Sequence, residues 1–102
     1  MFIAMNRFLI APGREKDFIE IWKNRDSHLE GVPGFKEFHL LQGPTNEKGT
    51  LFASHSIWES GEAFENWTKS EAFRQAHASA GGAREIYLGP PQLECFDVVF
   101  TT

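Results

Sequence analysis

The chain has 102 residues, a formal net charge of −4 at pH 7, and 41% hydrophobic and 24% charged residues. These values are typical of a globular protein with one domain, here residues 1–102. Acidic and basic residues are interspersed, which argues against nucleic acid as a partner, because phosphate binding needs a concentrated basic face. No apolar run approaches the roughly 20 residues that cross a bilayer, and the N-terminus lacks the features of a signal peptide. We therefore expect a cytoplasmic protein with no membrane partner.

The N-terminal third predicts a strand followed by a helix. Residues 2–11 are apolar and β-prone, and Pro12-Gly13 signals a turn after them. Residues 14–28 have the apolar spacing of an amphipathic helix. The apolar stripe of this helix consists of Phe18, Ile21, Trp22 and Leu29. Glycine and proline in residues 31–34 end the helix.

The middle of the chain predicts a β-hairpin and a second helix. Residues 35–42 and 50–58 are β-prone and flank a polar loop, which indicates an antiparallel pair. Ser60 is a predicted N-cap of the helix that follows. The apolar stripe changes direction after this helix, so we expect a break near Lys69 and a second helical segment.

The second helical segment and a last strand complete the chain. The stripe of the segment contains Phe73, Ala76, His77 and Ala80. Gly81-Gly82 ends the segment, and residues 93–100 predict the last strand. The order β-α-β-β-α-β predicts an α+β, ferredoxin-like fold. Such a sheet has helices on one face only, and a homodimer that buries the other face is the commonest solution.

Asn6 is a polar residue in an apolar strand. It shares one face of that strand with Phe2, Ala4, Phe8 and Ile10. A buried amide there needs hydrogen-bond partners, or it costs on the order of 1–3 kcal/mol. A bond to a neighbouring backbone group is the ordinary explanation, and a functional role is the alternative.

His77 lies on the apolar stripe of the second helical segment, beside small alanines. A packed core histidine is the usual explanation for such a position. However, a neutral imidazole that projects into an apolar cavity is also a suitable haem-iron ligand. Trp67 ends the preceding helix, and a break near Lys69 would let it share a cavity with His77. Alternatively, Trp67 is an ordinary core residue, as we expect Trp22 and Trp58 to be.

Other kinds of site find little support in the sequence. His39 and His55 lie on adjacent predicted strands and can pair across them, without acidic or cysteine residues at a metal-binding spacing. The single cysteine, Cys95, excludes an internal disulfide. The chain has no nucleophile elbow, phosphate loop or dinucleotide-binding motif.

Two segments, FIAMNRFLIAPG and SIWESGEAFENWTKSEAFRQAH, together with the element order, resemble the IsdG-type haem-degrading monooxygenases. These belong to the antibiotic-biosynthesis-monooxygenase superfamily of dimeric α+β barrels. The resemblance covers nearly the whole chain to about His77 and then the last strand. The combination of Asn6, Trp67 and His77 is more specific than the superfamily pattern W-E-S-x-E-A-F, because it matches the functional triad of the haem-degrading family in type, order and spacing.

The resemblance implies a role for each residue of the triad. His77 is similar to the proximal ligand of the haem iron, Asn6 to the hydrogen-bond donor on the distal side, and Trp67 to the residue that presses on and buckles the porphyrin. Haem is then both cofactor and substrate, opened by dioxygen and electrons from an external donor such as a reductase. In such an enzyme the protein controls the reactivity of haem through axial ligation, distal hydrogen bonding and distortion of the ring.

The segment from Ala78 to Gln92 is shorter and richer in glycine and proline than the corresponding loop of many family members. Arg84 in this loop is a candidate partner for a haem propionate. Two other functions stay open: a cofactor-free monooxygenase that acts on a quinone or polyphenol, and a haem carrier without turnover. His77 favours haem over a quinone, and Asn6 with Trp67 favours degradation over carriage.

Overall fold

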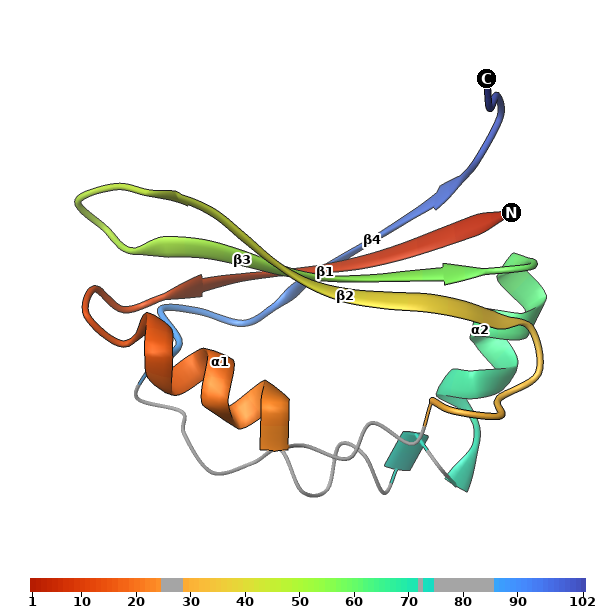
Figure 1. Cartoon of the computed structure of the whole chain (residues 1–102), viewed down its shortest axis with the longest axis horizontal. Helices are drawn as coiled ribbons and strands as arrows, with labels where there is room; N and C mark the ends of the chain where they lie inside the picture. The colour runs from red at the N-terminus through yellow and green to blue at the C-terminus, as the bar shows by residue number, and fades with distance from the viewer. Residues whose placement is uncertain (25–28, 72, 75–85) are drawn as a thin grey trace.

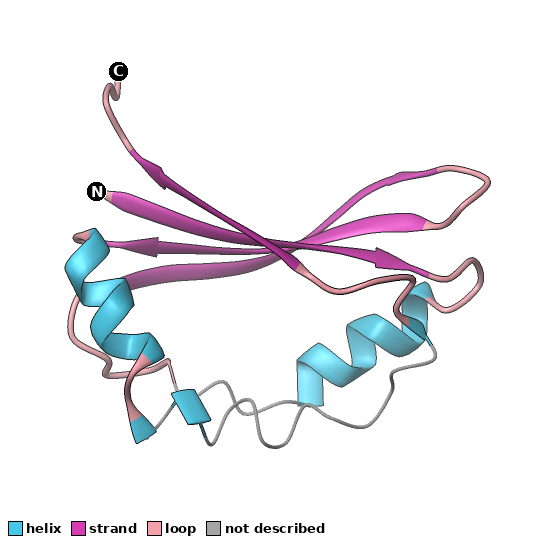
Figure 2. Cartoon of the chain, turned by 180° about the vertical axis from the view of Figure 1, so that it is seen from behind, coloured by secondary structure: helices cyan, strands magenta, loops and turns pink. Residues whose placement is uncertain are grey.

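The computed structural model describes residues 1–24, 29–71, 73–74 and 86–102. Four antiparallel strands form one sheet in the order β2-β3-β1-β4, and both helices lie on the same face of that sheet (Figures 1 and 2). The elements are β1 (Phe2–Ile10), α1 (Glu15–Asn24), β2 (Phe35–Thr45), β3 (Thr50–Trp58), α2 (Gly61–Thr68) and β4 (Gln92–Asp97). The ferredoxin-like order expected from the sequence is confirmed. Among the described residues, no helix is long and apolar enough to cross a membrane.

The alternation of residues along β1 assigns the two faces of the sheet. Ala4, Phe8 and Ile10 are buried, and Phe8 packs on Phe18 of α1 with ring centroids 5.5 Å apart. Phe2 contacts Phe64 of α2 at 5.7 Å. The even-numbered residues of β1 therefore face the helices, and Asn6 belongs to this set.

The core consists of two clusters at opposite ends of the helix-covered face. The α1 cluster contains Phe8, Ile10, Phe18, Phe52 and Ile86. The α2 cluster contains Leu29, Trp58 and Trp67. Each helix is fixed by its own cluster, and in Figure 1 α1 and α2 lie below opposite ends of the sheet.

Two strand ends differ from the expected boundaries for reasons of pairing. β2 continues past residue 42 to Thr45, because a bulge brings Thr45 opposite Thr50 and shortens the hairpin loop. β4 ends at Asp97 rather than at residue 100. Asp97 is opposite Phe2, the first residue of β1. Beyond it the Val98 N–H bonds to the Met1 carbonyl, and β1 offers no further residue for pairing. The rest of the first predicted helix, 25–28, and most of the second helical segment lie outside the described residues.

The predicted cap and break around α2 are both confirmed. The Ser60 Oγ accepts a hydrogen bond from the Ala63 N–H at 3.1 Å, which satisfies a free donor of the first turn. The helix ends with Lys69 as its C-cap. The Ser70 Oγ then accepts a hydrogen bond from the Phe73 N–H at 3.1 Å, in the manner of a second N-cap.

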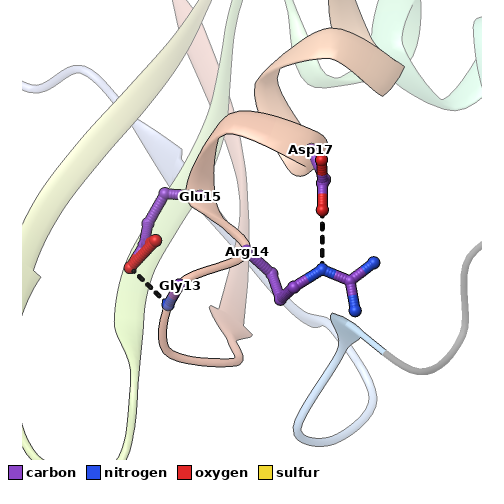
Figure 3. A network of polar contacts seen from close by, with 4 residues as sticks. All are labelled: Gly13, Arg14, Glu15 and Asp17. Atoms are coloured by element: carbon purple, nitrogen blue, oxygen red, sulfur yellow. Dashed lines mark hydrogen bonds and ion pairs between the residues drawn. The ribbon is translucent and has the colours of Figure 1, made fainter.

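A small polar network ties the start of α1 to the sheet. The Glu15 carboxylate accepts hydrogen bonds from the Gly13 N–H at 3.2 Å (Figure 3) and from the Thr50 hydroxyl at 3.0 Å. Gly13 has a φ of 82°, a conformation that favours glycine. Hydrogen bonds from its own backbone N–H, from Thr50 and from Gly13 lower the pKa of Glu15 below its ordinary 4.5. Thr50 is fully buried and also bonds to Thr45 at 2.8 Å.

Thr50→Val tests this network, because it keeps the shape of the side chain and removes the hydroxyl. We expect the buried position to lose about 1–2 kcal/mol of unfolding free energy at pH 7, measured by urea denaturation. The lowered pKa of Glu15 adds stability above its ordinary pKa, and this addition is lost as the pH falls through the lowered value. The difference from wild type should therefore be smaller at pH 3 than at pH 7. Thr45→Val, which removes only the bond between the two threonines, is the control and should show no such narrowing.

Candidate functional site

Small and polar side chains separate the two core clusters on the helix-covered face. Directly opposite residues of antiparallel strands share a face, and here Ala4 pairs with Ser56 while Asn6 pairs with Ser54. The flanking rows carry large aromatic residues, with Phe8 opposite Phe52 at the α1 end and Phe2 opposite Trp58 at the α2 end. The middle of the face therefore has small or polar side chains between two aromatic rows. We call these four residues the floor: Ala4, Asn6, Ser54 and Ser56.

The polar groups on this floor are not equally satisfied. The Ser56 hydroxyl donates to the Ala4 carbonyl at 3.2 Å and accepts from the Trp58 indole N–H at 2.9 Å. The Oδ1 atom of Asn6 is buried and has no hydrogen-bond partner in the part of the chain that the structure describes. Leaving a buried acceptor unpaired costs about 1–3 kcal/mol, and native proteins rarely accept this cost without a reason. The backbone partner that would explain Asn6 as an ordinary strand residue is not found for this oxygen.

Trp67 lies in the last turn of α2 and joins the α2 cluster. Its side chain is buried, with ring centroids 6.3 Å from Trp58 in a stacked pair and 5.4 Å from Phe73 in an edge contact. Trp58 is four residues along β3 from Ser54, the partner of Asn6, which is about 13 Å at the usual rise of a strand. A ligand that touched both Asn6 and the tryptophan pair would therefore have to be large.

The structure separates the histidines into two groups. His39 and His55 are direct cross-strand partners with ring centroids 6.2 Å apart, so their predicted pairing is confirmed. His55 is opposite Met5 on β1, on the face without helices, and neither ring can reach the floor around Asn6. His77, the predicted iron ligand, lies outside the described residues, as does Arg84. The described residues hold no cluster of three or more His, Cys, Asp or Glu side chains that suits a metal ion.

Cys95 is the described thiol on the same face as Asn6. It lies on β4 directly opposite Ala4. Partial desolvation raises the pKa of the Cys95 thiol. The thiol form therefore dominates at neutral pH, and it is a poor metal ligand compared with a thiolate.

A cavity beside α1 was not anticipated from the sequence. Its volume is about 310 Å³, and one wall is the stacked pair of Trp22 and Phe38, with centroids 5.7 Å apart and an interplanar angle of 15°. The lining residues are Ile19, Trp22, Lys23, Phe38, Leu40, Gln42 and Phe52. Trp22 packs on the α1 cluster as expected, yet it stays partly exposed and lines this cavity. The sequence signal was available in the alternation of Phe38, Leu40 and Gln42, which places all three on one face of β2.

Comparison with known proteins identifies the family. Residues 1–79 match the family described as "Antibiotic biosynthesis monooxygenase". This match includes Asn6, Trp67 and His77. The chain belongs to this family.

Within the family, the chain is similar to a haem oxygenase. It is 33% identical over 89 residues to "Heme oxygenase (staphylobilin-producing) 1" of Staphylococcus aureus, which covers 87% of this chain and 82% of the relative. The solved structure of the haem degrader MhuD from Mycobacterium tuberculosis, with two haems in its active site, is 28% identical with a TM-score of 0.73. That match covers 100% of this chain and 99% of MhuD. This family member therefore resembles the IsdG-type proteins in both sequence and fold.

Other solved members of the family share the fold at lower identity. SnoaB from Streptomyces nogalater, a cofactor-independent oxygenase, is 19% identical with a TM-score of 0.67, over 98% of this chain and 94% of SnoaB. At this identity the likeness concerns the fold alone. The monooxygenase fold thus accommodates proteins of different chemistry, and the residues on the floor of the site have to distinguish them.

Asn6→Leu tests whether this monooxygenase carries an unsatisfied amide at its site. Replacing the buried, unpaired amide with an apolar side chain of similar size should leave the unfolding free energy unchanged or raise it by about 1 kcal/mol, measured without added ligand. Ser56→Ala is the matched control on the same face. It removes a hydroxyl with two partners and should lower stability by about 1–2 kcal/mol. If Asn6→Leu lowered the unfolding free energy by more than the control variant does, Asn6 would have a structural role.

Proposed function

We propose that this family member is a haem-degrading monooxygenase. It binds haem as substrate and cofactor, opens the porphyrin with dioxygen and electrons, and releases iron and a bilin-type product. The observation that carries the proposal is the buried, unpartnered amide oxygen of Asn6 on a floor of small side chains. The similarity to the staphylococcal haem oxygenase supports it.

The residues of the floor fit a large, flat and mostly apolar ligand. Pockets for such ligands are lined by aromatic and aliphatic side chains with few polar groups. Here Ala4, Ser54 and Ser56 have small side chains, and the pair of Trp58 and Trp67 forms an apolar boundary at one end. Asn6 supplies an amide with both donor and acceptor capacity.

Each residue of the proposed triad has a separate task. His77 would hold the haem iron through a neutral imidazole nitrogen. The Asn6 amide would offer its N–H and carbonyl oxygen to polar groups of the ligand, and the pairing of β1 with β3 and β4 holds the Asn6 backbone in place. The Trp67 indole, fixed by its stacking on Trp58, would contact the ring and exclude water. When bound, haem supplies the redox chemistry, with electrons from an external donor such as a reductase.

Two rival functions differ in what they require of the site. A cofactor-free monooxygenase for a quinone or polyphenol needs no iron ligand at His77. A haem carrier needs the ligand but gains nothing from an unsatisfied amide, which costs stability. The two features together favour degradation.

The deciding experiment adds haemin to the purified protein and then ascorbate under air, while the Soret band is followed. We expect binding, followed by decay of the band and release of iron that a chelator can trap. A stable Soret band after reduction would leave the carrier function. If haemin did not bind, the cofactor-free function would remain.

Three variants assign the roles within the same assay. His77→Ala should abolish or greatly weaken haem binding, because it removes the proposed iron ligand.

Asn6→Ala should bind haem and lose about 10²–10³-fold in decay rate, the usual cost of one positioned hydrogen-bonding group. Trp67→Phe should bind with a flatter ring, visible by resonance Raman, and decay more slowly. Unchanged rates in both Asn6→Ala and Trp67→Phe would remove the proposed catalytic roles.

We also propose that the helix-free face of the sheet is covered by a second copy of the chain. Many of the residues that alternate with the buried set are apolar and partly or largely exposed on this face, beside polar residues such as Arg7 and His55. The apolar residues include Ile3, Met5, Leu9, Leu41, Leu51, Ile57 and Phe96. Monomeric proteins rarely expose so continuous an apolar surface.

Sedimentation velocity at micromolar concentration checks the dimer. Wild type should sediment as a dimer, with an interface above about 2,000 Å² in total. Phe96→Glu places a charge on the exposed face, where Phe96 is 49% exposed, and should yield a monomer. Leu88→Glu changes a side chain of similar exposure, 47%, outside the sheet, and should leave the dimer intact. A folded wild-type monomer would contradict the proposal.

A further inference from the structure

The cavity beside α1 has one charged residue in an otherwise mostly apolar lining. Ile19, Leu40 and Phe52 are aliphatic or aromatic, as are the stacked Trp22 and Phe38, and Gln42 is polar but neutral. Lys23 is the charged member of the lining. A cavity of this composition is complementary to a flat apolar molecule that carries a negative charge at one edge.

Lys23 is available for such a charge. It is exposed and lies in the last turn of α1, where a cation interacts favourably with the helix dipole. The other cations with partners in the described structure are engaged elsewhere, Arg7 with Glu94, Arg14 with Asp17 and Arg74 with Glu71. The Lys23 ammonium makes no ion pair with the described residues. Its long alkyl stem can remain along the cavity wall while the ammonium stays in water.

The lining of the cavity shares one residue, Leu40, with the row of the sheet that contains Asn6. Leu40 of the lining is opposite Ser54, and Ser54 is opposite Asn6. Leu40 and Asn6 are thus two strands apart on the same face, a separation of about 10 Å. A macrocycle beside Asn6 that extends over Ser54 and Leu40 therefore brings one edge to the cavity and Lys23.

We propose that this cavity takes the carboxylate-bearing edge of the ligand, with Lys23 as the ion-pair partner of a propionate and the Trp22–Phe38 pair as the wall beside it. The proposal rests on the proposed function and adds the orientation of the ring. The propionate edge points toward α1 and β2, and the apolar edge toward the Trp58–Trp67 pair. Lys23 is then a residue that determines specificity for the free acid over an uncharged analogue.

The expected contribution of Lys23 is modest because the ammonium is exposed. An exposed ion pair is worth up to about 1 kcal/mol, so removing it should weaken binding about 2- to 5-fold. Salt screens such a pair, and the effect should be smaller at 1 M than at 0.1 M ionic strength. A weaker Kd alone would not distinguish the loss of an ion pair from a local disturbance of the cavity. A porphyrin whose carboxylates are esterified distinguishes the two, because it cannot form the ion pair.

The test measures the Kd of iron protoporphyrin IX and of its dimethyl ester by Soret titration. Wild type should bind the acid more tightly than the ester. Lys23→Gln should reduce this preference about 2- to 5-fold, mainly by weakening the acid, and Lys23→Arg should restore it. Lys16→Gln, an exposed lysine on the same helix, is the control and should behave as wild type.

The outcomes separate this inference from the proposed function. If Lys23→Gln prefers the acid over the ester as strongly as wild type does, Lys23 does not bind the propionate, although the haem function stands. If Lys16→Gln lowers the preference equally, the effect is one of overall charge and the inference fails. If wild type binds neither porphyrin, both the inference and the proposed function are wrong.

Discussion

The packing of each helix on its own aromatic cluster is the constraint on which the rest of the structure depends. Phe18 of α1 contacts Phe52 at 4.7 Å between centroids, and Trp67 of α2 stacks on Trp58 at the other end of β3. Because β3 holds one anchor near each of its ends, the helices are fixed apart over one sheet face. The small residues Ala4, Ser54 and Ser56 then lie between the two clusters, and they form the floor of the candidate site.

Stability and function compete on that floor. Ser56 shows that a polar group there can be fully bonded within the sheet, through Ala4 and Trp58. Asn6 belongs to the next residue pair on the same face, and its carbonyl oxygen has no partner among the described residues. A protein selected for stability alone would place an apolar side chain at this position. Under the proposed function, a polar group of the ligand would bond to this amide.

The two faces of the sheet carry different chemistry because alternate residues of each strand point in opposite directions. The helix-covered face has aromatic walls, a small polar floor and a cavity with Lys23 at its margin. The other face has an apolar surface crossed by polar pairs, Arg7 with Glu94 and His39 with His55. The proposed ligand and the proposed second copy would therefore use opposite sides of one small sheet.

The sequence by itself determined the order of elements, the strand faces and the caps, because these depend on local periodicity and on residues such as Ser60. It also singled out Asn6 and Trp67, since a polar residue in an apolar strand and a family pattern are both visible without coordinates. Only the tertiary structure showed that the Asn6 oxygen has no partner among the described residues. It also placed His39 and His55 on the opposite face of the sheet from Asn6. The cavity lined by Trp22, Phe38 and Lys23 likewise became visible only in three dimensions. Each of these depends on which strands are neighbours and on how far helices stand from the sheet. Long-range packing sets those distances, and no local pattern encodes them.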